Sequence, residues 1–267
     1  MADSRPGRRL DKSSFAGLVI ALAGIVGGFL IEGGKAEQMV GLSAALIVFG
    51  GCAGAVMVAN PLPLIASALR RLNDVLFETT SDTAEMIDQV VNYAVMARKN
   101  GLVSLENEAM SAKDPYLRKS LLLAVDGADL DEIRSMMQLE SDVAESRAEQ
   151  EAKVFESAGG FAPTIGIIGA VLGLIIVMGQ IDDMNKVGHG IAAAFVATIY
   201  GVGSANLVLL PAAHKIKARA AHERERQEMI LAGVCGIVEG LNPKLIRTKL
   251  EAFAKAPGAP ERKAAKG

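Results

Sequence analysis

The sequence predicts an all-α, polytopic membrane protein with four transmembrane helices and a helical cytoplasmic domain between the second helix and the third. Hydrophobic residues make up 51% of the 267-residue chain and its mean hydropathy is +0.31, which is too apolar for an ordinary soluble domain. Charged residues still make up 22% of the chain, too many for a protein embedded entirely in lipid. Four uncharged runs separate the charged segments, and each reaches or approaches the roughly 20 residues that a bilayer-crossing helix needs.

These uncharged runs define the predicted spans: Ser13–Ile31, Gln38–Leu69, Ser157–Ile181 and Val187–Ala213. Basic residues precede the first run as they precede a signal peptide. However, its apolar part is longer than a usual signal-peptide core and no small-residue cleavage site follows it, so we expect an uncleaved helix. The second run is longer than a bilayer needs, and we expect Pro61 and Pro63 to mark where its helix leaves the membrane or bends.

Lysine and arginine are distributed unevenly around these runs. Four precede the first run, ten lie between Arg70 and Lys153, and twelve follow the fourth, whereas the two short hairpins hold only Lys35 and Lys186. Because basic residues accumulate on the cytoplasmic side, both termini are expected in the cytoplasm. The predicted organisation is a cytoplasmic N-terminus (1–14), two spans (15–69), a cytoplasmic helical domain (70–156), two further spans (157–213), a cytoplasmic helix (214–243) and a flexible tail (244–267).

Capping signals divide the cytoplasmic segments into helices. The predicted starts are Asp82 with Glu85, Ser104, Asp114 before Pro115, and Asp129 with Glu132; the predicted stops are Gly101 and Gly127. The helix after Asp129 should run directly into the third span. Beyond the fourth span, four basic residues are expected to anchor the helix at the lipid headgroups: His214, Lys215, Lys217 and Arg219. That helix should reach about Gly240 and end at Asn242-Pro243, and Pro257–Gly267 is expected to be disordered.

Several function classes lack the residues that they need. A net charge of -2 without a basic stripe argues against nucleic-acid binding. Cys52 and Cys235 fit neither a disulfide framework nor a zinc site, and no nucleophile pair or phosphate-binding loop is present. We therefore expect no enzyme activity, no metal and no cofactor.

The four runs also contain no aspartate or glutamate. Ion conduction through a bilayer normally uses an intramembrane ionisable group, and the one titratable candidate is His189, which is expected near the membrane surface. An ion-conducting assembly would therefore need a carboxylate from a partner. The third and fourth runs instead offer small residues, including the pair Gly169 and Gly173. These can pack helices within one chain or line a lumen around a foreign helix, and Thr198 can bond its own helix or face that lumen.

Several stretches together resemble the flagellar stator A subunit family, MotA or PomA, within the wider group that includes ExbB and TolQ. The resemblance rests on the four-span layout and on ARKNGLVSLE (97–106), APTIGIIGAVLGL (162–174) and GIAAAFVATIYG (190–201), followed by Pro211 and a basic exit. It covers about residues 14–243. The resemblance implies a bacterial inner-membrane subunit of a homopentamer around a dimer of B-subunit transmembrane helices, each of which carries the ion-binding aspartate. Together the two subunits form an ion channel that couples ion flow to torque on the rotor.

The resemblance also implies roles for particular residues. Thr198 matches the threonine that faces the ion route, and Pro163 and Pro211 match prolines linked to coupling. Arg98, Lys99 and Glu106 match charged positions that engage the rotor switch protein. Sodium-type relatives carry a second threonine where this chain has Ala170, and some carry an acid where it has Gly160, so protons are favoured over sodium.

Three alternative functions stay open from the sequence. An ExbB-like or TolQ-like energiser would drive envelope transport, but those relatives usually have one span before the large inner segment, and this chain has two. A self-sufficient channel or transporter would need a charged group of its own within the spans. A membrane scaffold without an ion role would tolerate loss of the Thr198 hydroxyl.

Overall fold

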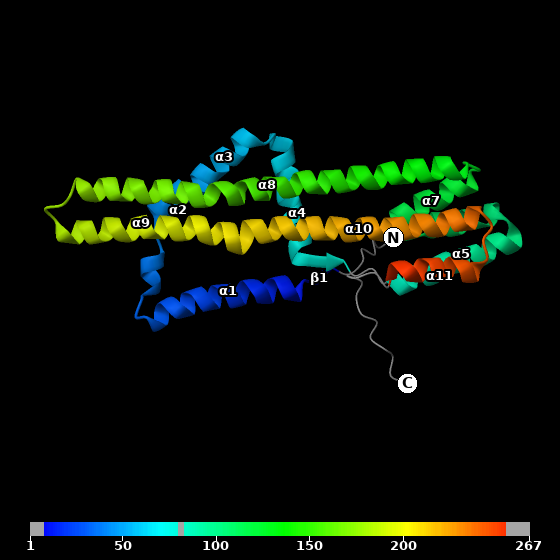
Figure 1. The fold of residues 1–267 in the computed structure, drawn as a ribbon, viewed down its shortest axis with the longest axis horizontal. Helices are drawn as coiled ribbons and strands as arrows, with labels where there is room; N and C mark the ends of the chain where they lie inside the picture. The colour runs from blue at the N-terminus through cyan, green and yellow to red at the C-terminus, as the bar shows by residue number, and fades with distance from the viewer. Residues whose placement is uncertain (1–7, 80–82, 255–267) are drawn as a thin grey trace. The chain divides into compact units, whose positions relative to one another are not determined.

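A computed structural model describes residues 8–79 and 83–254, and the chain divides into two compact units. Unit 1 contains residues 1–80 and 147–218, and unit 2 contains residues 81–146 and 219–267, as far as these are described. Helices form nearly all of the described structure (Figure 1), which confirms the predicted all-α class. One small element was not predicted: β1 (Arg8–Leu10) and β2 (Phe77–Thr79) pair in antiparallel register, with Leu10 opposite Phe77.

Within the described residues, four helical segments are long and apolar enough to cross a membrane, as the sequence predicted. The first is α1 (Lys12–Ile31), and the second comprises η1 (Ala36–Met39), α2 (Leu42–Ala45), the π-helix η2 (Leu46–Gly50) and α3 (Gly51–Ala59). The third lies in α8 (Leu130–Met178), and the fourth comprises α9 (Met184–Ser204), the π-helix η4 (Ala205–Leu209) and α10 (Leu210–Val238).

The ends of the spans follow from local chemistry. The carboxylate of Asp11 caps α1 by accepting hydrogen bonds from the backbone N–H groups of Ser13 (3.0 Å) and Ser14 (3.2 Å). At the end of α3, Asn60 adopts extended backbone angles, which the following Pro61 favours. The chain then starts a new helix, α4 (Leu62–Leu76). The expected break of the second run at Pro61 and Pro63 is therefore confirmed.

The third span is continuous with the helix that precedes it, as predicted. The carboxylate of Asp129 accepts a hydrogen bond from the backbone N–H of Glu132 (2.8 Å), and α8 then runs without interruption from Leu130 to Met178. Pro163 lies inside this helix. A proline inside a helix removes one backbone hydrogen bond, a loss that neighbouring helices can compensate in membrane proteins.

Unit 2 surrounds a single apolar core. Its further elements are α5 (Thr83–Asn100), η3 (Leu102–Leu105), α6 (Glu106–Ser111), α7 (Pro115–Val125) and α11 (Pro243–Ala254). Fully buried side chains from these elements, and from the parts of α8 and α10 in the unit, meet in this core; examples are Val90, Leu105, Leu117, Ile133, Ile230 and Leu250. Gly101 (φ 83°) and Gly127 (φ 84°) end α5 and α7 in the left-handed region, as their predicted roles as stops require.

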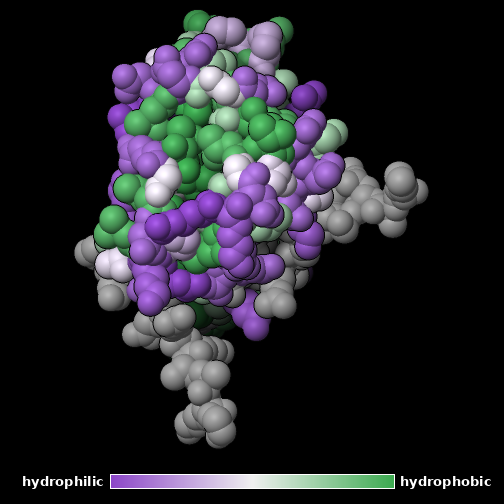
Figure 2. Space-filling view, turned by 90° about the vertical axis from the view of Figure 1, so that its right-hand side faces the viewer, coloured by the Kyte–Doolittle hydropathy of each residue, from purple (hydrophilic) through white to green (hydrophobic). Residues whose placement is uncertain are grey.

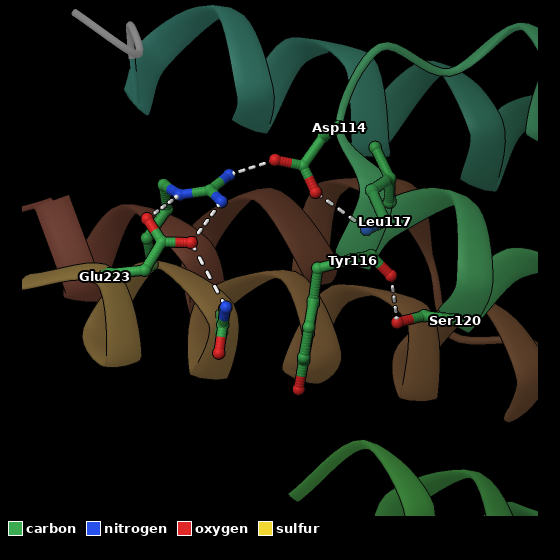
Figure 3. Close-up of polar contacts among 7 residues, drawn as sticks. Asp114, Tyr116, Leu117, Ser120 and Glu223 are labelled. Carbon is green, nitrogen blue, oxygen red and sulfur yellow. Dashed lines mark hydrogen bonds and ion pairs between the residues drawn. The ribbon is translucent and has the colours of Figure 1, made fainter. Parts of the chain in front are cut away.

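A half-buried arginine joins two helices of unit 2 (Figure 3). The carboxylate of Asp114 caps α7 by accepting from the backbone N–H of Leu117 (2.8 Å), and its second oxygen accepts from Arg226 of α10 (2.5 Å). Arg226 also donates to Glu223 (2.6 Å). Burial disfavours the charged guanidinium, but the hydrogen bond and charge of Glu223, with the charge of Asp114, outweigh it and raise the pKa of Arg226.

Four expectations about unit 2 need correction or lie beyond the description. Ser104 does not cap α6: it lies inside η3, and its hydroxyl donates to the carbonyl of Gly101 (2.7 Å). Pro243 follows the end of α10, but it also opens α11, a helix that the expected flexible segment from residue 244 did not include. Asp82 and the expected disorder of Pro257–Gly267 lie outside the described residues.

Candidate functional site

The candidate site in unit 1 is the seam between α8 and α9, where small residues bring two backbones close together. A Cβ atom placed on Gly166 would lie 2.9 Å from the carbonyl oxygen of Ala197 and 3.4 Å from Cα of Thr198. A Cβ atom on Gly173 would lie 3.2 Å from Cα of Ala194. These distances leave no room for side chains, so the glycines pack helices within this one chain. Figure 1 shows α8 and α9 side by side along this contact.

Three of the residues implied by resemblance lie along this seam. Thr198 faces Gly166 across it, and Pro163 and Ala170 lie three residues before and four residues after Gly166, on the same side of α8. All three are half-buried. The Thr198 hydroxyl donates to the carbonyl of Ala194 on its own helix, but at 3.5 Å this bond is long and weak. The hydroxyl is therefore held loosely enough to exchange its partner.

The other polar side chains of the stretch 196–211 also donate to backbone carbonyl groups. Ser204 donates to Gly201 (3.2 Å) and Asn206 to Val202 (2.9 Å), both on their own helix. Tyr200 donates to Met39 (2.8 Å), and its hydroxyl accepts from the N–H of Gly41 (3.2 Å). Hydrogen bonds of this kind make polar side chains tolerable in lipid. They leave this helix polar without adding a group that can ionise.

The π-helix η4 lies directly before Leu210 and Pro211. Proline has no N–H, so it cannot satisfy the carbonyl four residues earlier, and a local change of helical pitch can accommodate the loss. Such short π segments occur often at functional sites. Pro211 itself is exposed in unit 1, thirteen residues after Thr198.

Ion pairs connect the ends of the spans in unit 1. Lys215 pairs with the buried carboxylate of Asp11 and donates to the hydroxyl of Ser14 (2.6 Å). Lys217 pairs with Glu156 (2.7 Å). These two lysines therefore bind carboxylates of the same chain, which differs from the expected anchoring to lipid headgroups. Burial alone would raise the pKa of Asp11, but the hydrogen bonds from Lys215, Ser13 and Ser14 and the charge of Lys215 lower it well below its usual range.

A second candidate site is the charged turn of unit 2. Arg98 and Lys99 are in the last turn of α5, and Glu106 is the first residue of α6. All three side chains are exposed, whereas Leu105 beside them is fully buried and fixes the turn to the core. Within residues 8–79 and 83–254, no ion pair or side-chain hydrogen bond involves these three residues. Their charges are therefore available to a partner.

Comparison with known proteins gives matches along nearly the whole chain. Residues 15–101 match the motility protein A N-terminal family, and residues 108–229 match the MotA/TolQ/ExbB proton channel family. Motility protein A of Bacillus subtilis is 33% identical over 92% of this chain and 92% of its own length. The chain belongs to the MotA/TolQ/ExbB proton channel family. It lies in the motility protein A branch of that family, which is not a family of enzymes.

Other motility protein A relatives and two solved structures agree with this family membership. Motility protein A of Helicobacter pylori is 30% identical over 95% of the chain and 98% of its own length. The structure of C. jejuni MotAB superposes with a TM-score of 0.88 at 29% identity, covering 95% of this chain and all of the matched one. The flagellar MotAB stator complex from Bacillus subtilis gives a TM-score of 0.84 at 33% identity, covering 90% and 94%.

The structure shows ion pairs in unit 1 that the sequence did not predict. Glu151 is 4% exposed and pairs with Arg71 of α4 (2.7 Å), although 80 positions separate the two in sequence. Asp11 and Lys215 are 204 positions apart. Each of these residues has an ordinary charged sequence context, so periodicity and capping could not have paired them.

Proposed function

We propose that this chain is the A subunit of a flagellar stator, which forms an ion channel with a B subunit and couples ion flow to torque on the rotor. One observation carries the proposal: this chain is similar to MotAB chains along nearly its full length, and its predicted membrane spans contain no aspartate or glutamate. A channel of this family therefore takes its proton-binding carboxylate from elsewhere. The B-subunit helix is the source that the resemblance implies.

The α8–α9 seam supports a role for Thr198 in this channel. The residue is half-buried, and within the described part of the chain its hydroxyl bonds only to its own helix, at 3.5 Å. When the partner carboxylate gains or loses its proton, the hydroxyl can accept from the acid or donate to the carboxylate. The contact between Thr198 and the partner carboxylate would then have a different stability when the carboxylate is protonated and when it is ionised. Such a difference can drive the A subunit to rotate past the B subunit.

Stoichiometry and ion identity are further parts of the proposal. A homopentamer around two B-subunit helices would place five copies of the seam around the ion route. Ala170 offers a methyl group where a threonine would offer an oxygen ligand to a partly dehydrated sodium ion. This residue favours protons as the coupling ion.

The charged turn of unit 2 is proposed to contact the rotor switch protein. Arg98 and Lys99 present positive charge on one side of a tight turn and Glu106 negative charge on the other, and all three are exposed. Figure 2 shows a face on which apolar residues gather inside a hydrophilic rim, a surface type that suits a protein partner. The contact requires the turn to lie in the cytoplasm, which the distribution of lysine and arginine supports.

Substitution of Thr198 tests the proposed channel. Thr198→Val keeps the β-branched shape and removes the hydroxyl, and we expect motor torque in cells to fall while the protein still inserts and assembles. Thr198→Ser restores a hydroxyl and should recover much of the torque. Equal torque in the wild type and the valine variant would contradict the proposal and would fit a scaffold without an ion role.

A further inference from the structure

Helix α4 follows a membrane span with almost no linker. The span ends with α3 at Ala59, and only Asn60 and Pro61 precede the first residue of α4. A helix that starts two residues from a span begins in the headgroup layer of the bilayer. In Figure 1, α4 runs across the direction of α8, to which Arg71 connects it, so its position fits the membrane boundary.

The two sides of α4 contact different surroundings. Ala68 and Val75 are buried against the rest of unit 1. Leu62 (63% exposed) and Leu69 (57%) lie seven residues apart on another side, with the exposed Ala66 between them at helical spacing. An apolar stripe that starts at headgroup depth fits the boundary between headgroups and acyl chains. Lipid is therefore the occupant that the position of this helix favours.

Two adjacent arginines of α4 have different surroundings. Arg71 is turned toward α8 and pairs with the buried carboxylate of Glu151 (2.7 Å). Arg70 is exposed, and within the described ranges no ion pair or hydrogen bond involves its side chain. The first arginine therefore fixes the helix to unit 1, and the second points outward beside the leucine stripe.

A second exposed cation lies near the same boundary. Lys12 is the first residue of α1 and, among the described residues, also has no charged partner. The pairing of Leu10 in β1 with Phe77 in β2 brings the start of α1 beside the end of α4. Arg70 beside the apolar stripe, with a second cation near the end of the same helix, matches the chemistry of an anionic phospholipid: a phosphate with acyl chains below it.

We propose that α4 is a lipid-binding helix whose Leu62–Leu69 stripe lies in the bilayer and whose Arg70, with Lys12, binds the phosphate of an anionic phospholipid. In the proposed orientation this lipid belongs to the cytoplasmic leaflet. The site rests on the membrane-spanning fold alone and does not depend on a motor role, so a failed torque experiment would leave it standing.

The absence of tryptophan from the chain allows a direct test. In a Leu69→Trp variant the single tryptophan reports on this stripe, and the full chain is reconstituted into vesicles that contain brominated lipids, which quench tryptophan on contact. We expect quenching by brominated phosphatidylcholine. Phosphatidylglycerol without bromine, mixed into these vesicles, should relieve the quenching. It should compete about 30-fold better than its mole fraction predicts, the ratio that about 1 kcal/mol for each of the two cations gives.

Paired variants separate a specific site from general attraction by charge. Arg70→Gln in the Leu69→Trp background should lower the preference for phosphatidylglycerol about fivefold, while quenching by phosphatidylcholine shows that the fold is retained. Lys113→Gln, which removes an exposed cation from unit 2, should leave the preference unchanged. Free glycerol phosphate should not reduce the preference, because it lacks acyl chains.

Three results would overturn the proposal. An unquenched tryptophan at position 69 would show that the stripe does not contact lipid. Equal binding of phosphatidylglycerol and phosphatidylcholine would show that the site has no preference for anionic lipid. Equal effects of Arg70→Gln and Lys113→Gln on that preference would show that Arg70 forms no specific site. A Val103→Trp variant provides the negative reporter, because this exposed residue of unit 2 should remain unquenched.

Discussion

A close backbone contact between α8 and α9 makes Gly201→Ala the most informative substitution. A methyl group at Gly201 would overlap the carbonyl oxygen of Ala162 and lie 3.1 Å from Cα of Gly166. Both neighbours are backbone atoms of α8, so no side-chain rotation can relieve the overlap and the two helices must move apart. Overpacking of this kind costs about 1–3 kcal/mol, and the rigid backbone places this case near the upper end.

Gly203→Ala is a matched control on the same helix. A methyl group at Gly203 would meet nothing within 4 Å, while the gain in helix propensity from glycine to alanine is the same at both positions. The difference between the two variants therefore measures the overlap alone. In detergent, we expect the midpoint of thermal unfolding of Gly201→Ala to lie roughly 5–10 °C below that of Gly203→Ala. Equal midpoints would refute the close packing of α8 and α9.

Two further predictions concern charged residues. Arg98→Glu and Glu106→Lys should each lower motor torque, and because surface charges are screened by salt, the remaining torque should fall further at higher internal ionic strength; undiminished torque in both variants would contradict the rotor contact. Asp11→Asn should destabilise the chain by about 1.5–3 kcal/mol at neutral pH, the range for hydrogen bonds to charged groups. Because the folded pKa of Asp11 is lowered, its contribution is full above the unfolded pKa of about 4 and is lost as pH falls toward the folded value, so the gap between wild type and variant should narrow on acidification. A gap that widens toward low pH would contradict the pairing of Asp11 with Lys215.

Local signals in the sequence were sufficient for most helix boundaries. Gly101, Asp114 and Asp129 each act within a few residues of their own position, so capping rules could place them. The spans follow from run length in the same way. The prediction that Ser104 caps a helix was wrong. Its hydroxyl donates to the carbonyl of Gly101, three residues earlier, inside a 3-10 turn. A serine in such a turn looks the same in the sequence as a serine at a helix start.

Contacts between distant residues could not be predicted from the sequence. The ion pair of Arg71 with Glu151 depends on how α4 lies against α8, and no periodicity encodes that arrangement. The stacking of Phe49 on Tyr200 (5.9 Å between ring centroids) likewise depends on the packing of two spans. The small residues indicated close helix packing, but the sequence did not show which helices are packed. The structure shows that α8 and α9 of the same chain pack against each other at these residues.

Proton flux through the chain alone tests the central claim most directly. The claim is that this chain provides a neutral seam and that the proton-carrying acid comes from the B subunit. We predict that the purified chain in liposomes, under an imposed pH gradient, conducts no more protons than protein-free liposomes, while a known proton channel reconstituted in parallel conducts. Proton flux well above the protein-free background from the chain alone would contradict the claim.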